Sequence, residues 1–151
     1  MSLSQFQAPD PAAYNALVWL IARQIPPSKV STYGQIASMI PPPEGAAPDA
    51  YARLSPRWVG AAMRAAPDDV PWQRVINSQG KISPRGSGAG VDEQHARLEA
   101  EGVIFTPQGR VDFEIYAWDA PDPTWLRDHG LLPPRPLRQK PPAKPAQPGL
   151  F

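Results

Sequence analysis

The stretch SPRWVGAAMRAAP, residues 55–67, decides the fold that we expect for this chain. Ser55 followed by Pro56 is typical of a helix N-cap with proline at the first helical position, so a helix is predicted over Arg57–Ala66. Its side chains are unusually small, and Gly60 alone costs about 1 kcal/mol relative to alanine in a helix interior. Another element of the protein, or a binding partner, must therefore approach this backbone closely.

Two further helices are predicted before this one. The first covers Pro11–Gln24, with Asp10 as its N-cap and apolar residues at helical spacing. The second covers Tyr33–Ile40, is capped by Ser31-Thr32 and is ended by three prolines. The segment 41–54 is predicted to be a loop with at most one turn of helix. Two short helices joined by a loop, the second carrying arginines, are typical of a helix-turn-helix.

The second half of the chain indicates small β-hairpins around one more helix. Residues 75–77 and 81–83 flank Ser-Gln-Gly, and residues 103–106 and 110–113 flank Pro-Gln-Gly, so each pair is predicted to form a hairpin. Between them, Asp92–Glu101 is predicted to be helical, with Gly102 as its C′ residue. The expected fold class is mainly α with small β-hairpins.

The composition excludes several functions. The chain of 151 residues is long enough for one domain, has no cysteine, and has only His95 and His129 as histidines. Cysteine nucleophiles and thiolate metal sites are therefore excluded, and we expect neither a metal nor a cofactor. The sequence shows no signal peptide and no apolar run long enough to cross a membrane. We therefore expect a cytoplasmic monomer that does not bind membranes.

Basic residues are unevenly distributed although the formal net charge is only +1. Residues 53–85 hold six of them against Asp68 and Asp69: Arg53, Arg57, Arg64, Arg74, Lys81 and Arg85. Such a patch can bind phosphates, and an ordinary solvated surface is the alternative. Similarly, the small residues of 55–67 fit either tight internal packing or a slim helix lying in a DNA groove. The residues alone leave both pairs of alternatives open.

Four motifs in this order resemble a known family: STYGQIA (31–37), RWVGAAMR (57–64), PWQRVINSQGKIS (71–83) and EAEGV (99–103). They are similar to the winged helix-turn-helix DNA-binding domain of the O6-alkylguanine-DNA alkyltransferases, over about residues 11–113. In those enzymes a cysteine and then a histidine follow the proline of the third motif, whereas Trp72 and Gln73 stand here. This departure resembles the alkyltransferase-like proteins, in which tryptophan commonly replaces the alkyl acceptor.

The substitution removes the chemistry of alkyl transfer. A thiolate must accept the alkyl group and a neighbouring base must generate that thiolate. The indole of Trp72 is only a hydrogen-bond donor, and Gln73 has no usable proton affinity. Glu101 matches the acidic residue that orients the missing histidine, which leaves it a structural role. The resemblance therefore predicts binding without catalysis.

The resemblance also implies roles for DNA binding. Tyr33 would press on the phosphate beside the target and turn the nucleotide out, and Arg57, expected at its helix N-terminus, would fill the vacated place in the base stack. Trp72 and Arg85 would hold the flipped base. The remaining expected residues are Pro71 and Gln73 in the pocket, and Gly60, Ala61, Arg64 and Arg74 on DNA. From the residues alone, a core tryptophan is the alternative for Trp72.

The resulting hypothesis is a non-enzymatic sensor that binds O6-alkylguanine in duplex DNA through the minor groove, flips the nucleotide and directs it to nucleotide excision repair proteins. An alkyltransferase or glycosylase with unusual residues, and a winged-helix transcriptional regulator, are the alternatives. The domain is expected over 10–115, with an extension packing on it over 116–132. The proline-rich tail, 133–151, is either an arm that binds DNA or a partner, or a disordered remnant.

Overall fold

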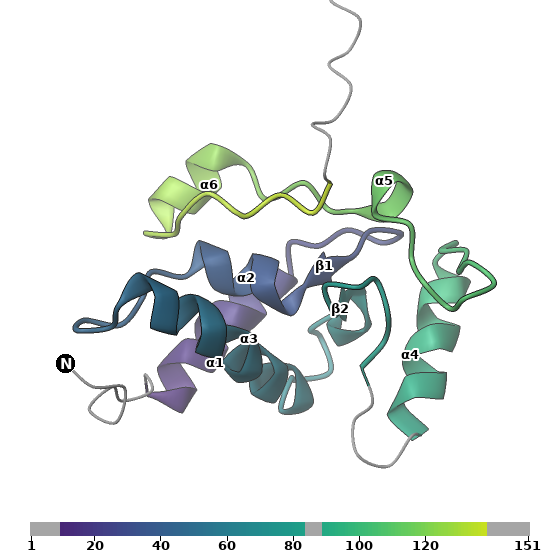
Figure 1. The fold of residues 1–151 in the computed structure, drawn as a ribbon, viewed down its shortest axis with the longest axis horizontal. Helices are drawn as coiled ribbons and strands as arrows, with labels where there is room; N and C mark the ends of the chain where they lie inside the picture. The colour runs from purple at the N-terminus through teal and green to yellow at the C-terminus, as the bar shows by residue number, and fades with distance from the viewer. Residues whose placement is uncertain (1–9, 84–88, 139–151) are drawn as a thin grey trace, which may run out of the picture.

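The computed structural model describes residues 10–83 and 89–138, and these form mainly helices around a small sheet (Figure 1). The predicted mainly helical fold is confirmed. The helices are α1 (Pro11–Ala22), α2 (Tyr33–Met39), α3 (Pro48–Arg64), α4 (Ala89–Ala100), α5 (Phe113–Tyr116) and α6 (Pro123–Asp128), with one 3₁₀ turn, η2 (Trp72–Arg74). None of these described helices is both long enough and apolar enough to cross a membrane.

Local signals set the ends of three helices as predicted. Helix α1 has Pro11 in its first turn, and α2 begins where the Thr32 hydroxyl accepts a hydrogen bond from the backbone N–H of Gln35 at 3.0 Å. Helix α4 ends in a Schellman motif at Gly102, whose φ is +100°. The N–H of Val103 donates to the carbonyl of Leu98 at 3.0 Å and closes that motif.

Helix α3 corrects the prediction for residues 41–66. It begins at Pro48 rather than after Pro56, so the predicted loop ends at residue 47 and Pro56 lies inside the helix. The predicted cap, Ser55, is instead buried in the helix. Tertiary packing explains the difference, because the extra turns bury Tyr51, whose hydroxyl donates to the carbonyl of Ala37 in α2 at 3.1 Å.

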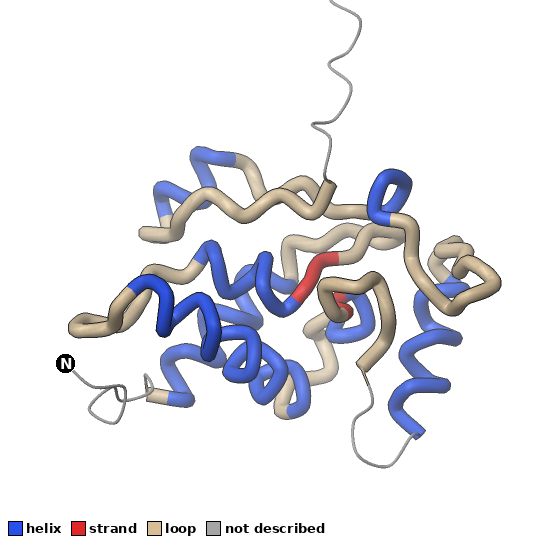
Figure 2. The backbone as a smooth tube through the Cα atoms, in the orientation of Figure 1, coloured by secondary structure: helices blue, strands red, loops and turns tan. Residues whose placement is uncertain are grey.

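The sheet is parallel and has two strands, β1 (Ser31–Thr32) and β2 (Val75–Ile76), shown in red in Figure 2. The predicted hairpin between 75–77 and 81–83 is therefore wrong as a strand pair, although its turn is present. The Asn77 side-chain oxygen accepts from the backbone N–H groups of Gln79 and Lys81, at 2.9 and 3.0 Å. These bonds close a tight turn and occupy the donors that a longer ladder would use.

The second predicted hairpin also reduces to a turn, because the residues after it pair elsewhere. The N–H of Thr106 donates to the carbonyl of Arg110 at 2.8 Å, but the N–H of Val111 donates to the carbonyl of Gly80 at 2.8 Å. The two turns thus dock on each other. A Cβ atom at Gly80, where φ is +79°, would lie 2.8 Å from the carbonyl oxygen of Val111, so this contact requires glycine.

Aromatic side chains join α1, α2 and α3 into the main core. The hydroxyls of Tyr14 and Tyr51 are 2.8 Å apart, and Trp58 packs edge-on against Tyr14 with ring centroids 5.7 Å apart. The indole N–H of Trp19 donates to the carbonyl of Ala62 at 2.8 Å and ties α1 to α3. These contacts fix α3 along its length, so its outer face has a defined orientation.

The chain after α5 returns to the helices. Val30, which precedes β1, exchanges backbone hydrogen bonds with Tyr116 and Trp118 at 2.9 and 2.8 Å. Trp118, Leu126 and Leu131 are buried against the main core. A second cluster lies beneath α4 and consists of Val30, Ile76, Leu98, Val103 and Val111. Residues 117–131 therefore form part of the packed structure.

Replacing Pro56 by alanine is expected to stabilise the protein. Proline inside a helix lacks a backbone donor and costs about 3 kcal/mol relative to alanine. The free energy of unfolding should therefore rise by roughly 1–3 kcal/mol, which thermal unfolding would report as a higher melting temperature. Pro48→Ala is the matched control, because proline is tolerated in the first turn. A melting temperature for Pro56→Ala at or below that of the wild type would contradict the expectation.

Candidate nucleic-acid interface

One face of α3 is exposed, basic and nearly free of bulk. Arg53, Arg57, Ala61 and Arg64 are exposed and Gly60 is half-buried. Their spacing of three or four residues places them in one stripe along the helix. This face lies opposite the side that carries the buried residues Ser55, Val59 and Ala62. The structure therefore brings four of the predicted DNA-binding residues together, and adds Arg53.

The two explanations for the small residues apply to different faces of α3. Ala62 is fully buried against α1, so internal packing explains its size. A Cβ atom at Gly60 would instead meet only the guanidinium of Arg64, at 3.8 Å among the described residues. Internal packing does not require glycine at this position. The outward small residues, Gly60 and Ala61, leave room for an external partner to approach the backbone.

The charge on this face is unbalanced. Within residues 10–83 and 89–138, no acidic side chain forms an ion pair with Arg53, Arg57 or Arg64. Arg57 lies in the middle of α3, which corrects its predicted place at a helix N-terminus. It can therefore extend from the centre of the stripe, with one arginine on either side along the helix axis. A surface of this kind favours a polyanion with a repeating charge.

Tyr33 is the first residue of α2 and follows β1 directly. It is half-buried and packs against the main core. The parallel register pairs Thr32 with Ile76, so Tyr33 lies at the same end of the sheet as the turn that begins at Asn77. Its aromatic ring is thus held by a rigid element, as a group that presses on a phosphate needs to be.

Trp72 lies at the other end of the sheet, in η2. It is half-buried beside the main core, and the guanidinium carbon of Arg97, from α4, lies 5.0 Å from the centroid of its ring. Pro71 and Gln73 line a small polar cavity of about 260 Å³ together with Arg74 and Arg97. Arg85, the other predicted base contact, lies outside the described residues.

Glu101 fixes the segment that carries Trp72. Its carboxylate accepts hydrogen bonds from Gln73 Nε2 at 2.8 Å, from Arg74 Nη2 at 2.9 Å and from the backbone N–H of Ser28 at 3.2 Å. Burial alone would raise the pKa of Glu101, but these hydrogen bonds outweigh it and hold that pKa below its ordinary value of 4.5. The carboxylate is therefore ionised and fully engaged at neutral pH.

Arg74 differs from the other predicted DNA contacts. Its Nε and Nη2 bind Glu101, its Nη1 donates to the carbonyl of Ile25 at 2.7 Å, and its side chain is only 15% exposed. This geometry favours a structural role over a phosphate contact. Sequence reasoning did not anticipate the pair, and it missed Arg97. It placed Arg53 in the basic patch but did not list it among the residues expected on DNA. For Arg53, the four-residue spacing to Arg57 was a usable signal.

Replacing Glu101 by glutamine is expected to destabilise the protein in a pH-dependent way. The lowered pKa means that the charged carboxylate adds stability above its ordinary pKa, and this contribution is lost as the pH falls through the folded-state value. At neutral pH, Glu101→Gln should lower the free energy of unfolding by about 2 kcal/mol, because Arg74 loses its charged partner. The difference from the wild type should shrink as the pH falls below the ordinary carboxyl pKa of 4.5.

Denaturant unfolding at several pH values measures this difference. Asp69→Asn is the control, because the pKa of Asp69 is also lowered by a hydrogen bond from Arg23, but this pair lies at the surface. Exposed pairs contribute little, so this variant should keep the wild-type profile. The expectation fails if Glu101→Gln and the wild type show parallel profiles.

Comparison with known proteins is consistent with this geometry. A family model described as 6-O-methylguanine DNA methyltransferase, DNA binding domain, matches residues 13–103. A DNA base-flipping protein of Vibrio parahaemolyticus is 42% identical over 103 residues, which cover 67% of this chain and 91% of that protein. Alkyltransferase-like protein 1 of Schizosaccharomyces pombe is 48% identical over 82 residues, which cover 53% of this chain and 67% of that protein.

A solved structure is similar as well. That of Schizosaccharomyces pombe Atl1 in complex with damaged DNA containing O6-carboxymethylguanine is 36% identical, with a TM-score of 0.54, and the match covers 71% of this chain and 95% of that chain. The predicted alkyltransferase type of DNA-binding fold is thereby confirmed. Through its DNA-binding domain, the chain belongs to the 6-O-methylguanine DNA methyltransferase family, where its relatives include base-flipping and alkyltransferase-like proteins.

Proposed function

We propose that this protein is a non-enzymatic sensor of O6-alkylguanine in duplex DNA. It binds through the minor groove, turns the damaged nucleotide out of the stack, holds it beside Trp72 and directs it to nucleotide excision repair. The observation that carries the proposal is the residue after Pro71, which is Trp72 in a chain without any cysteine. The protein keeps the family motifs for binding DNA, but it has no thiolate that could take the alkyl group.

The α3 stripe supports a groove-bound helix. The outward Gly60 and Ala61 allow the duplex to approach the backbone, while Arg53 and Arg64 can reach phosphates on either side. Arg57, between them, can enter the base stack where the nucleotide leaves. A regulator that reads base edges would instead need hydrogen-bonding side chains at the centre of the helix. The small residues there favour binding by shape and deformation.

The energetics favour extrusion of a modified base. An alkyl group on O6 weakens pairing, so the modified guanine costs less to unstack than a normal one. The Trp72 ring offers a flat surface for the extruded base, and stacking of this kind contributes about 1–3 kcal/mol per base. Trp72 is held by the Glu101 hydrogen bonds to the two residues that follow it. We infer that this rigidity lets the pocket form without a large ordering cost.

The same network supports binding without transfer. In place of a histidine, Gln73 donates its amide to Glu101 and has no proton to exchange at neutral pH. The Glu101 carboxylate, with its lowered pKa and charged partner, is a poor base. Binding then ends in a persistent complex of the protein with the damaged DNA. Such a complex is a suitable signal for excision repair proteins, and that coupling rests on the family resemblance.

Duplexes that differ in a single O6-methylguanine test lesion recognition. In a fluorescence or mobility-shift titration, we expect the wild type to bind the damaged duplex about tenfold or more tightly than its undamaged twin. Trp72→Ala should weaken binding to the damaged duplex by about 5- to 150-fold, the equivalent of roughly 1–3 kcal/mol of lost stacking. Trp125→Ala, a half-buried tryptophan of α6, is the matched control. Equal wild-type affinity for both duplexes would refute lesion recognition.

Mass measurements test the absence of catalysis. After incubation with the damaged duplex, we expect the mass of the protein and the base composition of the DNA to be unchanged. A gain of one methyl group on the protein would reveal a transferase, and release of the modified base would reveal a glycosylase. A cysteine-containing transferase treated in the same way should gain the methyl group and shows that the assay works.

A further inference from the structure

The last described segment, residues 131–138, lies along the outside of α2 (Figure 1). The N–H of Leu132 donates to the carbonyl of Met39 at 2.8 Å. The N–H of Arg135 donates to the Ser38 hydroxyl at 2.8 Å, and the carbonyl of Arg135 accepts from Gln35 Nε2 at 3.2 Å. Because α2 holds the backbone on both sides of its Cα atom, Arg135 has a fixed position.

The side chain of Arg135 is exposed and lies beside the start of α2. A Cβ atom at Gly34 would lie 3.6 Å from its Nη1, so the guanidinium lies over the residue that follows Tyr33. Arg135 also lines a small cavity of about 100 Å³ with Ala52 and Ser55 of α3. The charge is thus placed beside the first turn of α2, which Tyr33 begins, and near Ala52 and Ser55 in the N-terminal half of α3.

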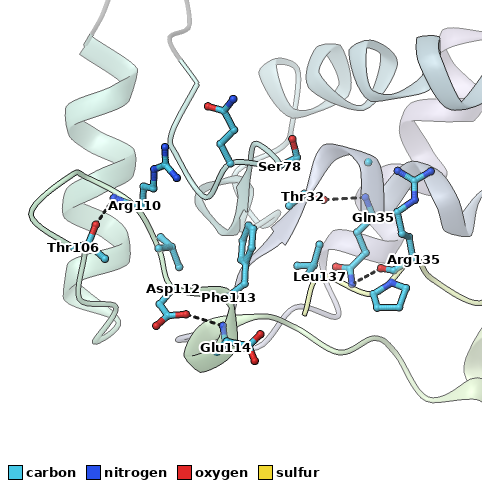
Figure 3. A pocket seen from close by; sticks show the side chains of 14 residues that line it. Thr32, Gln35, Ser78, Thr106, Arg110, Asp112, Phe113, Glu114, Arg135 and Leu137 are labelled. Atoms are coloured by element: carbon cyan, nitrogen blue, oxygen red, sulfur yellow. Dashed lines mark hydrogen bonds between the residues drawn. The ribbon is translucent and has the colours of Figure 1, made fainter. Parts of the chain in front are cut away.

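A larger cavity of about 640 Å³ opens on the other side of Arg135. Figure 3 shows Arg135 and Arg110 on opposite walls, with Ser78 between them on a third side. Asp112 and Glu114 also line this cavity, but in Figure 3 their carboxylates point away from the two guanidinium groups. The Asp112 carboxylate also caps α5 by accepting from the N–H of Glu114 at 2.9 Å. The side of the cavity near Gly34 is therefore basic.

Arg135 is the available cation of this segment. Arg138 forms an ion pair with Asp119 at 3.6 Å, and its side chain is only 17% exposed. Neither of the two residues lies in the part matched by the family model, which ends at residue 103. The similarity to Atl1 spans 95% of that chain but 71% of this one, so the match leaves part of this chain without a counterpart.

We propose that Arg135 contacts a phosphate of the DNA strand that passes over Tyr33, so that residues 131–138 widen the DNA-binding surface beyond the family domain. The inference rests on the proposed function for the presence of duplex DNA on this face, but it does not depend on lesion recognition. A backbone held by three hydrogen bonds to α2 presents the guanidinium at low entropic cost. Each phosphate contact releases counterions and steepens the dependence of affinity on salt.

The test is the salt dependence of binding to the undamaged duplex. The slope of log affinity against log salt is negative, and removing one phosphate contact reduces its magnitude by about 0.9. We therefore expect Arg135→Ala to show this reduction and Arg135→Lys to keep the wild-type slope. Arg127→Ala is the matched control, because Arg127 is an exposed arginine of α6 whose side chain donates to Thr124 at 3.2 Å. The alanine variant keeps both backbone hydrogen bonds of residue 135, and its melting temperature should match the wild type.

Two outcomes would overturn the proposal. An unchanged slope for Arg135→Ala would show that no phosphate is bound there, and an equal reduction for Arg127→Ala would show that only the net charge matters. The ratio of affinities for damaged and undamaged duplexes is measured with the same samples and reports the proposed function separately. If the wild type shows no preference for the lesion but its salt slope depends on Arg135, the phosphate contact is supported and the proposed lesion sensor is refuted.

Discussion

The carboxylate of Glu101 is the point at which three segments of the chain meet, and the placement of Trp72 depends on it. Gln73 and Arg74 bind it from η2, and Ser28 binds it from the connection between α1 and β1. Arg74 also reaches the carbonyl of Ile25, beyond the end of α1. A charged pair that is mostly buried is costly unless its donors are matched, so the segment has little freedom to take another arrangement.

In the proposed function, this network keeps the family scaffold in shape without the chemistry of alkyl transfer. In the alkyltransferases that this chain resembles, an acidic residue at this position orients a catalytic histidine. Here the same carboxylate holds a glutamine and an arginine, and its lowered pKa favours a permanent charge over proton exchange. In our proposal, Glu101 fixes an aromatic ring at a position where the transferases activate a nucleophile. That role suits a protein whose proposed task is to hold a base and release it unaltered.

The sequence was sufficient where local chemistry determines the structure. The Thr32 cap, Pro11 and the C′ glycine at 102 act within a few residues, so α1, α2 and the end of α4 could be predicted. The start of α3 could not, because the contact between Tyr51 and α2 outweighs the proline at 56. The hairpins failed for a similar reason, since the partners of β2 and Val111 are distant in sequence.

The candidate site could likewise be predicted only where local sequence patterns determine it. The α3 stripe follows from helical spacing once the helix is known, and the family motifs point to Tyr33 and Trp72. The engagement of Arg74 requires knowledge of where Glu101 lies, which no local pattern supplies.

The proposed function separates affinity for DNA from selectivity for the lesion in space. In the proposed function, the group that holds a damaged base lies in η2, and Tyr33 at the start of α2 turns the nucleotide out of the stack. The proposed phosphate contacts of Arg53, Arg64 and Arg135 would act on every duplex alike. A protein without covalent chemistry must hold the lesion by equilibrium binding alone, so a wider phosphate-binding surface lengthens every encounter. Gln35 connects these two regions, because its buried side-chain amide accepts a hydrogen bond from the Ser31 hydroxyl of β1 and donates one to the carbonyl of Arg135. Gln35 thus anchors the start of α2 and also positions the backbone that carries the Arg135 guanidinium.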